Sequence, residues 1–142
     1  MTMHSRNAVR DAVLFHSVFF ALAIPVALAL DGHALGLALC GFALAYNVLL
    51  PSVGKRLAHD DWVDLWKFLL PLSIALPCAD WMLVERMGTL TFPDHGIARI
   101  GGAVPVYFMG LWIMLLWQVC WLAMATKRPY ASVAVLSLAG FL

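Results

Sequence analysis

Charged side chains are the scarcest part of this sequence. Only 12% of its 142 residues are Asp, Glu, Lys or Arg, about half the share of an ordinary soluble domain. The mean hydropathy is +0.89. The 9 basic and 8 acidic residues nearly cancel, so the chain has no strongly basic surface for a nucleic-acid backbone. This composition excludes a disordered chain and a nucleic-acid-binding protein.

Signatures of metal, nucleotide and covalent chemistry are lacking as well. The sequence has no P-loop, dinucleotide fingerprint, zincin motif or nucleophile elbow. Its three cysteines share no CxxC spacing and lie in apolar runs, so we interpret them as small buried residues. The sequence is therefore not that of a disulfide scaffold. His16 is the only histidine deep in an apolar run, whereas a haem held between helices needs two. Asp94 and His95, even with Glu85, are too loosely spaced for a metal motif. We expect neither a cofactor nor a metal.

Long uncharged runs take the place of charge. They cover 12–30, 32–54, 100–126 and 129–142. About 20 apolar residues cross a membrane core of about 30 Å. The sequence therefore predicts an all-α bundle of four to five transmembrane helices in a single integral membrane domain, 1–142. The expected helices lie at about 9–30, 33–51, 65–86, 105–126 and 129–142, with an outer loop at 87–104.

The first and last segments leave alternatives open. A basic head, an apolar run and Ala27-Leu28-Ala29 are also typical of a cleaved signal peptide. We interpret the segment as a retained anchor, because its apolar run is long and three more hydrophobic segments follow. The last segment, 129–142, is short for a crossing. It is either a half-helix or part of a longer chain.

The second segment carries a face of small residues. Gly36, Cys40, Ala43 and Asn47 fall on one side of a helix. Small residues let helices approach closely, and a buried amide can hydrogen-bond across the contact. This face predicts packing, either inside the bundle or in a homo- or hetero-oligomer. The polar stretch that follows, 52–64, is expected to be a surface loop, with a short interfacial helix near Trp62 and Trp66 as the alternative.

Basic residues orient the predicted bundle. Of the nine Lys and Arg, only Arg86 and Arg99 lie on the side of the loop 87–104, while the others lie in the head, at 55–67 and at Lys127-Arg128. The positive-inside rule places the amino terminus in the cytoplasm and that loop outside. We expect a multi-pass protein of the cell membrane, the inner membrane if the source is bacterial.

The third segment forces an acid below the membrane surface. Its uncharged run, 68–79, gives only about 18 Å of helix at 1.5 Å per residue. A crossing helix must therefore include Asp80, which lies roughly 9 Å along the axis from Arg86. An acid at such a depth needs a partner or a function. Asp80 is expected either to act as a general acid or to pair with Arg86, Arg99 or a loop amide.

Polar and aromatic residues near this helix complete the candidate site. The candidate catalytic acids are Asp80, Glu85 and Asp94. The candidate substrate-binding residues come from the end of the third segment, from the outer loop and from the fourth segment, which carries an aromatic stripe. They are Trp81, Arg86, His95, Arg99, Tyr107, Trp112, Trp117 and Gln118. Such a stripe could line a pocket, although aromatic residues at helical spacing also fit plain packing. Gln118 lies near the expected bilayer centre, where its amide needs hydrogen-bond partners.

A set of residues from the third helix to the fourth is arranged as in a known family. They are Asp80-Trp81, Arg86, Gly88, Thr91-Phe92-Pro93, Gly101-Gly102 and Pro105. Over about 80–116 this pattern resembles the membrane-embedded lycopene cyclase domain family. The resemblance implies a small helical membrane enzyme that cyclises the ends of a linear carotenoid. Such an enzyme protonates a double bond and lets a carbocation close the ring.

The sequence departs from that family at the presumed acid centre. The family's second helix begins with a proline followed by paired glutamates, whereas this chain has Pro105-Val106-Tyr107-Phe108. Protonation would then fall to Asp80, Glu85 or Asp94. The leading hypothesis is a cyclase or isomerase of a lipid-soluble isoprenoid or carotenoid-like substrate. The alternative is a non-enzymatic membrane subunit or scaffold, and a third hypothesis is a small ion or proton pathway.

Overall fold

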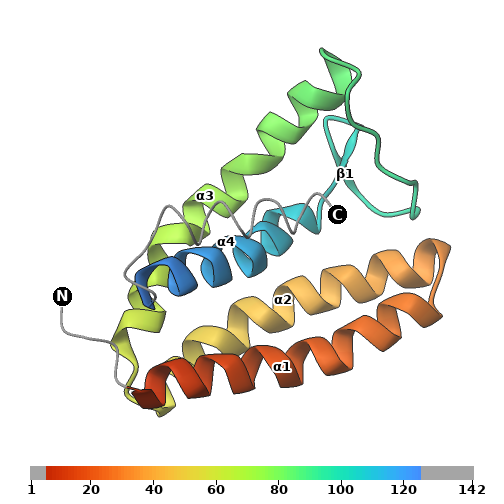
Figure 1. Ribbon diagram of the computed structural model, residues 1–142. Helices are drawn as coiled ribbons and strands as arrows, with labels where there is room; N and C mark the ends of the chain where they lie inside the picture. Colours follow the sequence, from red (N-terminus) through yellow and green to blue (C-terminus); the bar gives the residue numbers. More distant parts are fainter. Residues whose placement is uncertain (1–5, 126–142) are drawn as a thin grey trace.

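The structure is a computed structural model that describes residues 6–125, so the helix expected at 129–142 lies outside the described residues. Figure 1 shows helices joined by two short turns and one long outer loop. The helices are α1 (Arg6–Ala29), α2 (Gly32–Arg56), α3 (Asp60–Glu85) and α4 (Phe108–Ala125). The outer loop ends in a small antiparallel hairpin of β1 (Arg99–Ile100) and β2 (Val104–Pro105). The prediction of an all-α membrane helix bundle is confirmed.

Three of the helices are long and apolar enough to cross a membrane. The mean hydropathies of α1, α2 and α3 in their most apolar windows are 2.2, 1.8 and 1.5. Large apolar side chains on these helices point outward: Leu28 is 82% exposed, Phe68 73% and Leu44 69%. Soluble monomers rarely expose such large apolar surfaces, whereas lipid tails would cover them. The fourth helix, α4, has 18 residues and is about 27 Å long.

The helices form an up-and-down arrangement around α4. Helices α1 and α2 make an antiparallel pair, and α4 lies between α2 and α3 (Figure 1). The carboxyl-terminal end of α3 diverges from α1 and α2. The tight turn between α1 and α2 uses Gly32 at a φ of +46°. In the core, Trp117 stacks on Trp121 at 5.1 Å between ring centroids, and Trp62 meets Trp117 edge-on at 5.6 Å. Aromatic packing thus fixes α4 against the beginning of α3.

The stretch expected as a loop at 52–64 is mostly helical. Helix α2 continues through Pro51 to Arg56, and α3 begins at Asp60, five residues before the expected start at 65. The last turn of α2 carries basic residues and the first turn of α3 carries acidic ones, which complements both helix dipoles. Close packing also holds the turn, because a Cβ on Gly54 would lie 3.1 Å from the Cβ of Trp62. A high density of charged residues in this stretch is therefore not evidence for a loop, because those residues lie in helix ends.

The start of α4 also differs from the expectation. The helix begins at Phe108, not at Pro105, because Pro105 is part of β2 and pairs in register with Arg99. Gly101 and Gly102 make the turn of this hairpin with φ angles of +57° and +77°. These left-handed angles are easy for glycine and strained for other residues. The chain therefore turns once more before it enters α4.

The outer loop folds back onto α2. A Cβ built on Gly36 would lie 2.8 Å from the Cβ of His95 and 2.9 Å from Ile97 Cγ2. His33 Nδ1 donates a hydrogen bond of 3.3 Å to the carbonyl oxygen of His95. The small-residue face predicted on this helix is thus used inside the chain, by the outer loop at Gly36 and by α4 farther along, where Ala43 is buried.

Gly36→Ala is expected to lower the free energy of unfolding by about 1–3 kcal/mol, because the added methyl group overpacks the contact with the loop. Gly41→Ala is the matched control, since nothing lies within 4 Å of a Cβ at that position. That change should stabilise α2 by up to about 1 kcal/mol through helix propensity. Denaturant titrations followed by circular dichroism measure both effects. Equal effects of the two substitutions would contradict the packing described for Gly36.

Candidate functional site

Asp80 is buried and joins α3 to α4. Its side chain is on the inward face of α3, and the residue is 6% exposed. Asp80 Oδ2 accepts a hydrogen bond of 2.7 Å from Nε1 of Trp112, in the second turn of α4. Among residues 6–125 it forms no ion pair with Arg86 or Arg99. The partner that the sequence required is therefore an indole N–H and not a cation.

The two arginines of the outer side have other contacts. The Arg86 guanidinium lies over the Trp81 ring, 5.9 Å from its centroid. Arg99 Nη2 donates a hydrogen bond of 2.9 Å to the carbonyl oxygen of Phe92. Trp81 also faces the hairpin turn, where a Cβ on Gly101 would clash with its indole. These contacts order the outer loop.

The other two candidate acids lie at the surface. Glu85 is the last residue of α3 and is exposed. Asp94 is also exposed, and its Oδ1 accepts a hydrogen bond of 2.9 Å from the backbone N–H of Gly96, closing a local turn. No group of three His, Cys, Asp or Glu within residues 6–125 could hold a metal ion. The structure thus does not bring the three predicted acids together.

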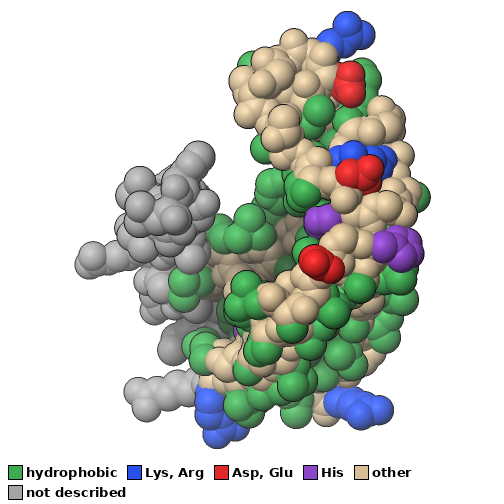
Figure 2. All heavy atoms as spheres, turned by 90° about the vertical axis from the view of Figure 1, so that its right-hand side faces the viewer, with side chains coloured by type: hydrophobic (Ala, Val, Ile, Leu, Met, Phe, Trp, Pro, Cys, Tyr) green, Lys and Arg blue, Asp and Glu red, His purple; other side chains and the backbone are tan. Residues whose placement is uncertain are grey.

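His95 and Tyr107 do come together, at the outer end of α4. Their rings stack at 6.1 Å with an interplanar angle of 26°, and the Tyr107 hydroxyl lies 3.3 Å from His95 Nδ1. Burial raises the pKa of the Tyr107 hydroxyl, so this group is protonated at neutral pH and can donate to the imidazole. This face of the molecule mixes acidic, basic and histidine side chains (Figure 2).

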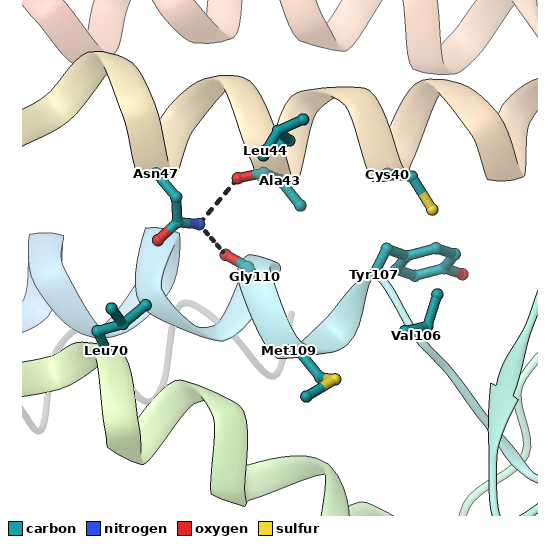
Figure 3. A pocket seen from close by; sticks show the side chains of 9 residues that line it. All are labelled: Cys40, Ala43, Leu44, Asn47, Leu70, Val106, Tyr107, Met109 and Gly110. Atoms are coloured by element: carbon teal, nitrogen blue, oxygen red, sulfur yellow. Dashed lines mark hydrogen bonds between the residues drawn. The ribbon is translucent and has the colours of Figure 1, made fainter.

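A cavity of about 310 Å³ lies between α2 and α4, next to Tyr107 (Figure 3). We call it the α2–α4 cavity. Its lining is apolar apart from an amide, a phenol and a thiol, and consists of Cys40, Ala43, Leu44, Asn47, Leu70, Val106, Tyr107, Met109 and Gly110. Leu44 is 69% exposed, so the cavity opens on the apolar outer surface of α2. A molecule dissolved in the bilayer could enter it from the side.

Asn47 fixes the inner end of this cavity. Its Nδ2 donates to the carbonyl oxygens of Ala43 at 2.8 Å and Gly110 at 3.2 Å (Figure 3). Its Oδ1 accepts a hydrogen bond of 3.1 Å from Trp66 Nε1. The packing role expected for Asn47 agrees with these contacts, which join α2, α3 and α4. Gly110 allows the close approach, since a Cβ there would lie 2.8 Å from the Cβ of Ala43.

The remaining substrate-binding candidates lie on the other side of α4. Trp117 and Gln118 border a second cavity, of about 360 Å³, between α1 and α4. We call it the α1–α4 cavity. His16 also lines it and bonds Tyr46 Oη through Nε2 at 2.7 Å. Sequence reasoning set His16 aside as half of a missing haem pair, although a lone histidine in an apolar run already indicated a buried hydrogen-bond partner.

Residues 77–142 match a protein-family model described as Domain of unknown function (DUF6989). No curated protein and no solved structure matches the chain. The match covers α4 and the outer loop, and it extends beyond the described residues. It carries no statement about activity.

The expected resemblance to the lycopene cyclase domain family is wrong, because DUF6989 and no lycopene cyclase family matches this region. The residues that suggested it have structural roles in the loop. Gly88, Gly101 and Gly102 adopt left-handed φ angles, and Trp81 contacts both the hairpin turn and Arg86. Glycines with such angles are common in tight turns of many folds, so the pattern is not specific to one family.

A double-mutant cycle tests the role of Asp80. Asp80→Leu and Trp112→Phe should each destabilise the protein, and their coupling energy should be about 1 kcal/mol, because each substitution removes one partner of the same buried hydrogen bond. Unfolding followed by circular dichroism at 222 nm measures the coupling. Glu85→Leu is the matched control and should show no coupling to Trp112→Phe. Additive effects of Asp80→Leu and Trp112→Phe would contradict a direct interaction between the two side chains.

Proposed function

We propose that this protein is a non-enzymatic membrane protein that binds a lipid-soluble molecule in the α2–α4 cavity. The observation that carries the proposal is the cavity itself. Its volume of about 310 Å³ falls at the lower end of the range for small-molecule sites, about 300–1,000 Å³. The lining is apolar and the opening faces lipid at Leu44. Both properties suit an isoprenoid or acyl chain.

The distribution of acids supports binding without chemistry. Protonation of a double bond requires a general acid within hydrogen-bond reach of the substrate. Within residues 6–125, none of the residues that line the α2–α4 cavity is an Asp or Glu. Asp80 is not among the lining residues of this cavity, and it accepts the indole N–H of Trp112 instead. The described lining therefore favours binding of a ligand over a cyclase or isomerase reaction.

One polar contact is offered at the outer end of the cavity. Tyr107 lines the cavity and pairs with His95 of the outer loop. A ligand with a single polar end, such as an isoprenoid alcohol, would place that end here and its chain along α2 and α4. Gly36 and Asn47 already contact other parts of the chain. An oligomer through α2 would therefore use its exposed face, which includes Leu37 and Val48.

The proposal includes an orientation in the membrane, with the amino terminus in the cytoplasm. The α2–α3 turn at 57–59 follows Lys55 and Arg56, and the positive-inside rule favours this end for the cytoplasm. The outer loop at 86–107 would then face the opposite side.

Single cysteines test this orientation. In a chain whose three cysteines are replaced by alanine, a membrane-impermeant maleimide added to intact cells should label Thr89→Cys and not Leu57→Cys. Both positions are exposed, so disruption of the cells should make them equally reactive. The opposite pattern would invert the proposed topology.

The binding proposal is tested by filling the α2–α4 cavity. Cys40→Phe puts a ring into the lining, and Cys78→Phe is the matched control on the exposed face of α3. A diazirine derivative of farnesol should crosslink within 40–47 and 106–110 of the wild-type protein, as located by peptide mass spectrometry. Crosslinking should fall several-fold in Cys40→Phe and stay unchanged in Cys78→Phe.

Equal crosslinking in both variants would overturn the proposal. A diazirine derivative of palmitic acid, used in parallel, distinguishes an isoprenoid from an acyl chain. Circular dichroism of each purified variant verifies that the helices are retained.

A further inference from the structure

The α1–α4 cavity differs from the α2–α4 cavity in depth and in chemistry. It lies beside the middle and the inner end of α4, whereas the α2–α4 cavity lies beside its outer end. Its volume is about 360 Å³, and it is lined by Ala12, Val13, His16, Ser17, Phe20, Trp117, Gln118, Trp121 and Leu122. Four of these residues carry aromatic rings, and two others carry polar groups within an otherwise apolar run. Such a combination is typical of a site that orients a ring-bearing ligand.

The imidazole of His16 has no hydrogen-bonding group left for a ligand. Its Nδ1 lies 2.8 Å from the carbonyl oxygen of Ala12, and a carbonyl oxygen only accepts, so Nδ1 carries the proton. In the neutral ring, Nε2 then accepts from the Tyr46 hydroxyl at 2.7 Å. Tyr46 is fully buried. His16 therefore offers the cavity a ring, which stacks on Trp117 at 5.0 Å between centroids.

Gln118, unlike His16, has a hydrogen-bond acceptor that a ligand can use. Its Nε2 donates a hydrogen bond of 2.8 Å to the carbonyl oxygen of Met114, one turn earlier. Among residues 6–125, its Oε1 accepts no hydrogen bond and is not enclosed by the packing. An amide oxygen at membrane depth gains free energy from a donor. Ser17, on the α1 side of the cavity, adds a hydroxyl.

We propose that the α1–α4 cavity binds a lipid-soluble phenol, whose hydroxyl donates to Gln118 Oε1 and whose ring packs among the aromatic side chains of the wall. Aromatic rings gain from edge-to-face and offset contacts beyond the area they bury. A hydroxyl can also accept from Ser17. This site is separate from the α2–α4 cavity, and the proposal does not depend on the function proposed above.

Binding of two matched probes tests the proposal on the full chain in lipid nanodiscs. Tritiated 4-octylphenol carries the donor, and 4-octylanisole is the same molecule with the hydroxyl methylated. The wild-type protein should bind the phenol saturably and about tenfold more tightly than the anisole, as expected for one hydrogen bond. Gln118→Leu should abolish this preference. Ser17→Phe, which fills the cavity from its exposed rim, should abolish binding of both probes.

The other cavity supplies the control. Cys40→Phe, which blocks the α2–α4 cavity, should leave phenol binding unchanged. Equal affinity of the wild-type protein for the two probes would overturn the hydrogen bond to Gln118. Phenol binding that survives Ser17→Phe but not Cys40→Phe would overturn the location. If Gln118→Leu does not fold, two other measurements test the proposal. They are the affinities of the wild-type protein for the two probes and the binding of both probes to Ser17→Phe.

Discussion

The amide of Asn47 joins three helices at the level where α4 lies between its neighbours. From α2 it donates to Gly110 of α4, and it accepts from Trp66 of α3. Water is absent from the core of a bilayer, so a polar group there must be satisfied by the protein itself. The Asn47 side chain thus connects α2, α3 and α4 at one point. It also forms part of the lining of the α2–α4 cavity.

The same requirement explains the other polar residues at membrane depth. Ser73 donates to the carbonyl oxygen of Met109 at 2.7 Å, Asp80 accepts from Trp112, and His16 pairs with Tyr46. Each bond joins two different helices. An intramembrane polar residue is a functional candidate by default, but here most of these residues contribute to assembly of the bundle. Gln118 differs from them, because its amide donates within its own helix, to the carbonyl oxygen of Met114, and joins no second helix among residues 6–125.

Much of the fold follows from the sequence, because hydropathy and helix length are local properties. The long uncharged runs predicted α1, α2 and α4, and the short uncharged run of α3 predicted that Asp80 lies below the membrane surface. The partner of Asp80 was not predictable, because Trp112 is 32 positions away and nothing local sets the rotation of α4 against α3. The helical course of 52–64 was missed because charge was taken as the mark of a loop, although basic residues at the end of α2 and acidic ones at the start of α3 also stabilise helix ends. The glycines of the outer loop were read as a family pattern, while their left-handed backbone angles serve the turns themselves.

The position of α4 between two side cavities has a mechanical consequence. A void leaves the atoms that line it without dispersion partners on one side, so α4 is held less firmly on its two cavity-facing sides than against α3. Compression favours states with less void volume. An occupant of either cavity would restore dispersion contacts on that side and would hold α4 more firmly in the bundle. The helix that supplies much of the core therefore also forms a wall of each of these two cavities.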